Sequence, residues 1–214
     1  MKITDSCIHP YPKGDSSLRR MLGEASELGY DSAVVVHEGP IPDKTVLPVL
    51  RGWIIGEESV RAVVNRIRKI PPGTDIVMVE ARDTAFNRGV LSLRGVHVLR
   101  GIHCSPSRAL DHVAARLAAQ HRVAIEIDLY PLLHERKGAR QRVLHRYEDV
   151  LMLHRKVRFP LVISSGARSI LDLRSVRETH SLCSLFGMRE EEVSRALATP
   201  GSVRERKGPV EVVT

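Results

Sequence analysis

Potential ligand side chains stand where short apolar runs of the chain end. Two such runs, VAIEIDL at 123–129 and FPLVISSGAR at 159–168, are rich in β-branched residues and pass directly into polar ones. Buried parallel strands have this composition, and their carboxyl ends carry the functional groups of α/β sheets and barrels. The second run ends in Ser164, Ser165, Gly166 and Arg168, without the Asp and His of a catalytic metal centre. This cationic end is better suited to phosphate than to a metal ion.

The spacing of Asp5, Cys7 and His9 allows a second kind of chemistry. On a strand, residues two apart point to the same side, so these three side chains can converge on a metal ion. The rest of this candidate ligand set consists of His37, Glu38 and His103, which also follow apolar runs. Hydrogen bonding at the rim of a barrel is the simpler interpretation of Asp5, Cys7 and His9, and an ordinary place on the rim is that of His37 and His103. A metal-dependent phosphoesterase is kept as the alternative function.

Several familiar catalytic motifs do not occur in the sequence. It has no glycine-rich phosphate loop with its Lys, no Gly-x-Ser-x-Gly elbow, no His-Glu-x-x-His motif and no Rossmann glycine fingerprint. Most nucleotide-driven and serine-hydrolase functions are therefore disfavoured.

Positive charge is concentrated in one region of the chain. The formal net charge is +8, yet residues 1–57 hold six Lys or Arg against eight Asp or Glu. Between 134 and 158, eight Lys or Arg residues face only three Asp or Glu. Such a patch attracts a polyanion by releasing condensed counterions. A helix face that serves only solubility is the competing interpretation.

Apolar runs of strand type alternate with amphipathic stretches along the chain, which predicts repeated βα units. We expect one domain over 1–200, an α/β, TIM-barrel-like (β/α) barrel of about seven strands, followed by a C-terminal tail or docking segment over 201–214. The expected strands lie at 3–8, 31–37, 52–56, 75–80, 96–99, 123–129 and 161–164.

Helices are expected between these strands. Apolar stripes at helical spacing occur in 18–25, 60–67, 110–118 and 143–151. Ser105-Pro106 predicts the start of the third of these helices. Ser175 and Glu178 have the spacing of a capping box, and a last helix is expected to close at 199–201, where the sequence reads TPG.

Cysteine usage and hydropathy predict a cytoplasmic protein. Cys7, Cys104 and Cys183 are odd in number and far apart, which disfavours a disulfide framework. No uncharged stretch reaches the length that spans a bilayer, so no membrane partner is expected.

Two family resemblances join these observations. Asp5-x-Cys7-x-His9, HEG at 37–39 and SGAR at 165–168 resemble motifs of the polymerase and histidinol phosphatase superfamily of metal hydrolases. In the last motif, Gly166 and Arg168 stand where that superfamily has ligands, and neither can hold an ion.

From about residue 5 to about residue 200, the chain resembles the ribonuclease P component 3 family. The resemblance is carried by FNR at 86–88, VHVLR at 96–100, VAIEIDL at 123–129, the basic helix through Leu153 and Arg155, PLVISSGA at 160–167, DLR at 172–174 and LFG at 185–187.

The second resemblance implies a protein subunit of ribonuclease P, the ribonucleoprotein that removes the 5′ leader of precursor tRNA. It implies a barrel descended from the hydrolase scaffold, and a catalytic RNA subunit that uses Mg²⁺. This chain is then one part of an endoribonuclease. The chain itself is expected to have no catalytic residues and no bound cofactor. The implied partners are the ribonuclease P RNA, protein component 2 and the other protein subunits, with precursor tRNA contacted indirectly.

The basic residues predict how such a subunit holds RNA. Aromatic residues make up only 4% of the chain, which disfavours base stacking and favours folded RNA contacted through its backbone. The candidate RNA-binding residues are Arg82, Asn87, Arg88, Arg94, Arg100, Lys137, Arg140, Arg142, Ser164, Ser165 and Arg168. A non-enzymatic scaffold that contacts only protein is the third hypothesis.

Overall fold

A computed structural model describes residues 2–204 of the protein, and its centre is a parallel sheet of seven strands. The strands follow one another in the sheet in chain order, each parallel to the next. They are β1 (Thr4–Ile8), β2 (Ser32–Val35), β3 (Val49–Ile55), β4 (Ile76–Glu80), β5 (Val98–Arg100), β6 (Ala124–Asp128) and β7 (Leu161–Ser164).

The sheet curls until its two edges meet. The amide of His9 donates to the carbonyl of Ala167 at 2.8 Å, and the amide of Gly166 donates to the carbonyl of Cys7 at 3.1 Å. These bonds join the end of β1 to the segment that follows β7. The predicted TIM-barrel-like fold of about seven strands is therefore confirmed.

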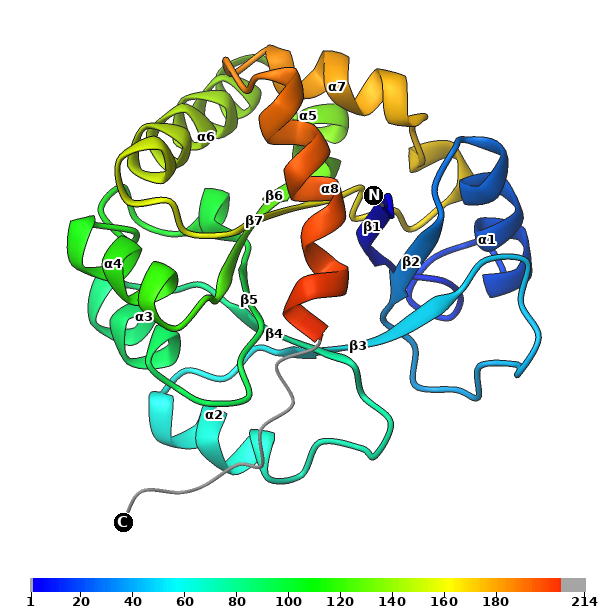
Figure 1. The fold of residues 1–214 in the computed structure, drawn as a ribbon, viewed down its shortest axis with the longest axis horizontal. Helices are drawn as coiled ribbons and strands as arrows, with labels where there is room; N and C mark the ends of the chain where they lie inside the picture. Colours follow the sequence, from blue (N-terminus) through cyan, green and yellow to red (C-terminus); the bar gives the residue numbers. More distant parts are fainter. Residues whose placement is uncertain (1, 205–214) are drawn as a thin grey trace.

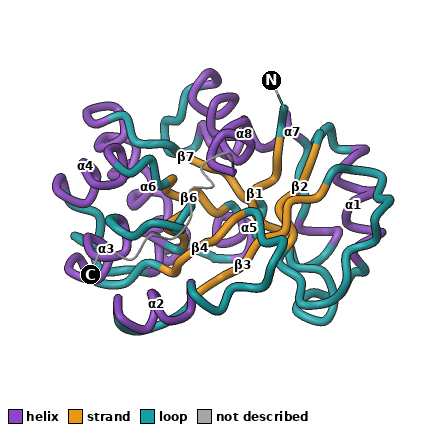
Figure 2. Tube along the Cα trace, turned by 60° about the horizontal axis from the view of Figure 1, so that its bottom comes forward, coloured by secondary structure: helices purple, strands orange, loops and turns teal. Residues whose placement is uncertain are grey.

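Helices surround this nearly closed barrel (Figure 1). The α-helices are α1 (Leu18–Glu27), α2 (Val60–Ile67), α3 (Thr84–Leu91), α4 (His112–Gln120), α5 (Tyr130–His134), α6 (Lys137–Val157), α7 (Val176–Ser184) and α8 (Glu190–Arg204). Two 3-10 helices, η1 (Ile102–Cys104) and η2 (Ile170–Asp172), follow strand ends. Figure 2 shows the strands side by side with helices packed along their outer side.

Short polar side chains determine where the outer helices begin. Asp83 accepts a hydrogen bond from the amide of Phe86 at 2.8 Å, and this cap opens α3. Ser175 and Glu178 bond to each other's backbone amides at the start of α7, which confirms the predicted capping box.

Apolar side chains fill two layers, one inside the barrel and one between the barrel and its helices. The inner layer includes Cys7, Val34, Met78 and Val162, which alternate along their strands with residues of the outer layer. Tyr147 of α6 and Phe159 are the largest fully buried side chains of the outer layer.

Helix α8 covers the end of the barrel where the strands begin. It lies across the middle of the strands in Figure 1 and packs against β1, β4 and β7. Val203 joins the apolar cluster inside the barrel, and Arg204 forms an ion pair of 3.0 Å with Asp75, just before β4.

The predicted end of the last helix at 199–201 is wrong, because α8 continues through Pro200 to Arg204. The contacts of Val203 and Arg204 stabilise the final turn although Pro200 lacks an amide hydrogen. The expected boundary between 200 and 201 falls inside this helix. Residues 205–214 of the predicted tail lie outside the described residues.

The predicted start of the helix after β5 is also wrong. Ser105 donates to the carbonyl of Ile102, and α4 begins after Asp111, whose carboxylate accepts from the amide of Ala114 at 2.9 Å. Residues 84–91 form α3, a helix that the apolar stripes did not predict. Within residues 2–204, none of the helices has the length and apolar character needed to cross a bilayer.

Candidate functional site

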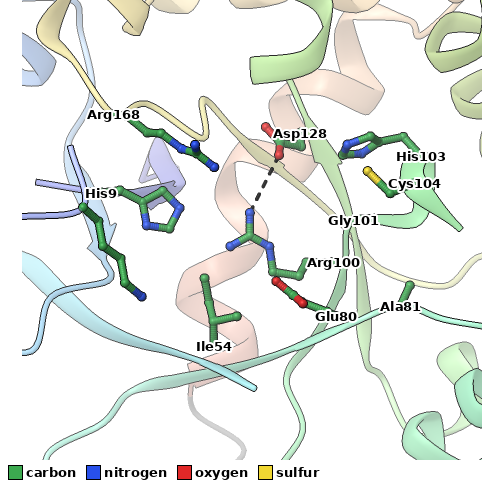
Figure 3. A pocket seen from close by; sticks show the side chains of 11 residues that line it. His9, Ile54, Glu80, Ala81, Arg100, Gly101, His103, Cys104, Asp128 and Arg168 are labelled. Carbon is green, nitrogen blue, oxygen red and sulfur yellow. Dashed lines mark ion pairs between the residues drawn. The ribbon is translucent and has the colours of Figure 1, made fainter. Parts of the chain in front are cut away.

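The carboxyl ends of the strands surround a cavity of about 570 Å³ (Figure 3). We call this end of the barrel the mouth. It is lined by His9, Lys13, Ile54, Glu80, Ala81, Arg100, Gly101, His103, Cys104, Asp128 and Arg168. These residues come from the ends of β1, β3, β4, β5 and β6 and from the segment after β7. The structure therefore gathers the strand ends into one site, as active sites of this fold are gathered.

A buried guanidinium group stands at the centre of the mouth. Arg100, only 9% exposed, reaches inward from the end of β5. Its Nε lies 3.3 Å from Oε2 of Glu126, and its Nη2 lies 3.7 Å from Oδ2 of Asp128. Burial opposes the charge of this group most strongly, but the combined attraction of Glu126, Asp128 and Glu80 outweighs it and raises the pKa of Arg100. The positive charge is thus permanent and held by protein carboxylates.

The three residues with metal-ligand spacing in β1 form hydrogen bonds within the protein. The sulfur of Cys7 lies 3.4 Å from Nε2 of His9 and accepts from Nη1 of Arg100 at 3.5 Å. Oδ1 of Asp5 accepts the amides of Cys7 at 3.1 Å and Ser165 at 3.0 Å. Cys7 and His9 lie together, but the register of β1 shifts between Asp5 and Ile8, and the three side chains are linked to Arg100 and to backbone amides.

Burial perturbs every titratable group of this part of β1. It raises the pKa of the Asp5 carboxyl to about 6 and that of the Cys7 thiol to about 12. It lowers the pKa of His9 to about 3, with further lowering by the charges of Arg100, Arg168 and Lys13. At neutral pH, Cys7 is therefore a thiol and His9 a neutral imidazole.

Gly166 and Asp128 meet at the wall of the mouth. Gly166 has a φ of +60°, and a Cβ atom at this position would lie 2.5 Å from Oδ1 of Asp128. Only glycine fits both conditions. Burial and the charge of Glu126 raise the pKa of Asp128.

Of the other candidate metal ligands, His103 lines the mouth with His9, and His37 and Glu38 do not. His37 and Glu38 line a second cavity of about 260 Å³ with Trp53 and Arg66. Nδ1 of His103 lies 3.1 Å from the hydroxyl of Tyr147.

In the part of the chain that the structure describes, no group of three or more His, Cys, Asp or Glu side chains is arranged to hold a metal ion. The donor set does not fit the metal centre of the hydrolase superfamily, because Arg100 already neutralises the central carboxylates.

Three predicted RNA contacts lie at or under the mouth. The side chain of Arg168 is exposed, and its guanidinium lies over the ring of Tyr130, 5.0 Å from the ring centroid. Ser164 and Ser165 are buried below it, and Ser164 donates to Oε1 of Glu126 at 2.8 Å. Ser165 accepts from the amide of Ala167 at 3.1 Å.

Other predicted contacts belong to the packing around α3. Asn87 is completely buried, and its amide group bonds to the backbone of Arg82 and to the carbonyl of Ala109. The guanidinium of Arg82 donates to the carbonyls of Gly56 and Glu57. Arg88 forms an ion pair with Asp111, the cap of α4.

The remaining predicted cations lie at two ends of the barrel. Lys137, Arg140 and Arg142 are exposed at the start of α6, on the side of the mouth, because α5 and α6 follow the end of β6. Arg140 also donates to the carbonyl of Glu135 at 3.0 Å. Arg94 precedes β5 and so lies at the opposite end.

Sequence reasoning missed two functional residues of the mouth. Glu126 forms an ion pair with Arg100. The sequence signal for Glu126 is an acidic residue inside an apolar run, two positions before Asp128. Lys13 lines both the mouth and the second cavity beside His37. Its neighbour Gly14 packs so closely on the backbone of His9 and Arg168 that a Cβ atom has no room.

The sequence matches known proteins over most of its length. The family model "RNase P subunit p30" covers residues 2–208. Ribonuclease P protein component 3 of Methanothermobacter thermautotrophicus is 33% identical over 210 residues, 91% of this chain and 85% of that protein. The protein of the same name in Methanosarcina acetivorans is 34% identical over 219 residues, 97% and 92% of the two chains.

Two solved structures share the fold. A chain in the cryo-EM structure of archaeal ribonuclease P with mature tRNA has a TM-score of 0.76 at 21% identity, over 99% of this chain and 98% of that one. Histidinol phosphate phosphatase of Lactococcus lactis, in complex with zinc, L-histidinol and phosphate, has a TM-score of 0.62 at 12% identity, over 88% and 95%. At these identities the likeness shows a common barrel.

Proposed function

The chain belongs to the RNase P subunit p30 family, and on this premise we propose that it is a protein subunit of ribonuclease P that holds RNA by its phosphates. In this role it stabilises the catalytic RNA subunit and leaves the cleavage of the tRNA leader, with its Mg²⁺, to that RNA. Its partners are the ribonuclease P RNA, protein component 2 and the other protein subunits. Precursor tRNA is reached through the RNA.

The observation that carries the non-catalytic role is the position of Arg100. A metal hydrolase uses the central carboxylates of its mouth to hold divalent ions. Here Glu126 and Asp128 hold a guanidinium group at 3.3 and 3.7 Å instead. A permanently charged side chain thus engages the central carboxylates, and it cannot activate water as a metal does.

Exposed cations beside the mouth supply the proposed RNA contacts. Arg168 and Lys13 lie on the rim, and Lys137, Arg140 and Arg142 extend the positive surface along the start of α6. Guanidinium groups bind phosphate oxygens through paired hydrogen bonds, whichever base is attached. We assign a supporting role to Asn87, Ser164 and Ser165, because their polar atoms are engaged within the protein.

Reconstitution tests this role. The ribonuclease P RNA and its companion proteins are assembled with and without this chain, and removal of the 5′ leader is measured over a series of Mg²⁺ concentrations. We expect omission to raise the Mg²⁺ requirement, because the phosphates lose their protein cations. Leader removal that is unaffected at low Mg²⁺ would contradict the proposal.

A matched pair of variants locates the contact. Replacing Lys137, Arg140 and Arg142 together by Gln is expected to raise the Mg²⁺ requirement. The control replaces Arg61, Arg68 and Lys69, exposed on and after α2, by Gln. Equal effects of the two variants would show that overall charge, and not this surface, is responsible.

A further inference from the structure

His9 has a ring nitrogen without a partner at the floor of the mouth. The residue is 8% exposed, and its Nδ1 is buried without a hydrogen bond in the structure. Figure 3 shows the ring turned toward the middle of the cavity, between Arg168 and Arg100. A buried polar atom without a partner is costly, so its position calls for a ligand.

The neighbours of His9 determine which nitrogen carries the hydrogen. The sulfur of Cys7 accepts from Arg100, and the thiol stays protonated because burial raises its pKa to about 12. That thiol hydrogen is directed to Nε2 of His9, 3.4 Å away. Nδ1 of the neutral ring is then the N–H side, and the unpartnered group is a donor.

The charges that face this donor favour an anion. Lys13 and Arg168 line the same cavity, both side chains are exposed, and both lower the pKa of His9 by their charge. Arg100 is already paired with Glu126 and Asp128, and Glu80 is the other acidic residue of the lining. The wall around His9 therefore offers two cations and one N–H donor to a group with several acceptor oxygens.

We infer that the mouth binds a single phosphate group, held by the side chains of Lys13 and Arg168, and that a turn of the His9 ring brings its covered Nδ1–H to the same group. A phosphate group presents three acceptor oxygens when it ends a chain, and a cavity of about 570 Å³ has room for it together with part of a nucleotide. A nucleic-acid duplex is too wide to enter a cavity of this volume. The ligand is thus a free phosphate or the phosphate of an unpaired RNA segment. This inference deepens the proposed role, but it concerns the isolated protein.

The first test titrates the full chain with inorganic phosphate at constant ionic strength. NMR records the ring nitrogens of His9 and the Nε–H of Arg168. We expect a saturable shift at both. Arg168→Gln and Lys13→Gln should each weaken binding about tenfold, the size of one charge-assisted hydrogen bond. Arg116→Gln, an exposed cation on α4, should leave it unchanged. No saturable shift at His9, or equal weakening by all three substitutions, would overturn the site.

A second arm identifies the source of the phosphate. Two oligoribonucleotides of one sequence, with a 5′-phosphate and with a 5′-hydroxyl, compete with inorganic phosphate at His9. Competition by the first alone assigns a chain-end phosphate, competition by both assigns an internal phosphodiester, and competition by neither assigns free phosphate. These measurements need no other subunit. A negative result here therefore contradicts the phosphate site and not the proposed role in ribonuclease P, and a negative reconstitution test contradicts that role and not the phosphate site.

Discussion

Nε of Arg100 lies 3.3 Å from a carboxylate oxygen of Glu126 inside the barrel, and both side chains are almost completely withdrawn from solvent. The two residues are neighbours on adjacent strands, because Leu99 is in register with Ile125. The pair stands on the axis of the barrel, where the site would otherwise hold two unpaired carboxylates.

Removing this guanidinium should destabilise the protein strongly. Arg100→Met leaves Glu126 and Asp128 buried together, and breaking a buried pair in this way costs about 3–5 kcal/mol. Urea unfolding measures the change. The matched control is Arg88→Met, which breaks the half-exposed pair with Asp111 and should cost about 1 kcal/mol. Similar costs for the two variants would mean that Arg100 is not the counter-charge of the mouth.

The Asp5 carboxyl should make stability fall as pH rises. Its pKa is raised by burial to about 6, so the folded state holds the proton that the unfolded state loses near 3.8. The stabilisation is complete below pH 3.8 and is lost as pH rises through about 6. Asp5→Asn keeps an oxygen for the amides of Cys7 and Ser165, so we expect it to gain about 3 kcal/mol relative to wild type between pH 4 and pH 7.

An oppositely shifted carboxyl provides the control for this pH dependence. The hydroxyl of Ser16 lowers the pKa of Asp15, so Asp15→Asn should lose stability relative to wild type as pH rises. Because the pKa of Asp15 is lowered below its ordinary value of 3.8, its effect lies mostly below pH 4, so unfolding curves for both variants from pH 2 to pH 8 measure the two slopes. Slopes of the same sign would refute the assignment for Asp5.

Gly166→Ala should destabilise the mouth. The backbone at a φ of +60° and the contact of the new methyl group with Asp128 together cost about 1–3 kcal/mol or more. Gly23→Ala, inside α1 with open space around it, should instead stabilise by about 0.5–1 kcal/mol. Thermal unfolding separates the two outcomes. A Gly166→Ala variant as stable as wild type would show that the residues around Gly166 shift to make room for the methyl group.

Asn87 should affect folding without affecting RNA. Asn87→Ala removes three hydrogen bonds to the backbone of Arg82 and Ala109, at a cost of about 2–4 kcal/mol. Unfolding experiments measure this loss. RNA affinity, measured with the folded variant at low temperature, should equal that of wild type. A lower affinity at full folding would return Asn87 to the RNA-binding residues.

Arg168→Ala should weaken RNA binding and change its dependence on salt. One phosphate contact contributes about 0.9 to the slope of log affinity against log salt on duplex nucleic acid, so the slope should flatten by roughly that amount. The affinity of this protein for the RNA in the assembled particle, measured at four salt concentrations, gives the slope. Arg116→Ala is the control on α4. A slope identical to wild type would exclude Arg168 as a phosphate contact.

Local patterns in the sequence predicted the strands of the barrel well. They predicted poorly the ion pairs and hydrogen bonds between residues that are far apart in the sequence. The strand at 161–164 coincides with β7, because a β-branched run between turns is decided by near neighbours. Helix α3 was missed because Gly89 and Asn87 weaken its propensity, and its cap at Asp83 and its packing stabilise it. Asn87 looked like a surface residue, and only the fold shows that it ties two loops together.

Arg100 illustrates the same limit for the site. Its position at a strand end was visible in the sequence, but its pairing with Glu126 depends on the register of β5 and β6. The exposed cation Arg168 and the buried cation Arg100 look alike in the sequence, because only closure of the sheet assigns one to the rim and the other to the interior.

The covering of the barrel by α8 imposes an order on biosynthesis. The ribosome has made every strand once residue 164 is added, yet the apolar interior beneath Val203 stays open until residue 203 has left the exit tunnel. At about 5–20 residues per second, elongation over this stretch takes about 2–8 s. During that time the apolar interior of the barrel is exposed in the nascent chain, and chaperones would bind it at this stage.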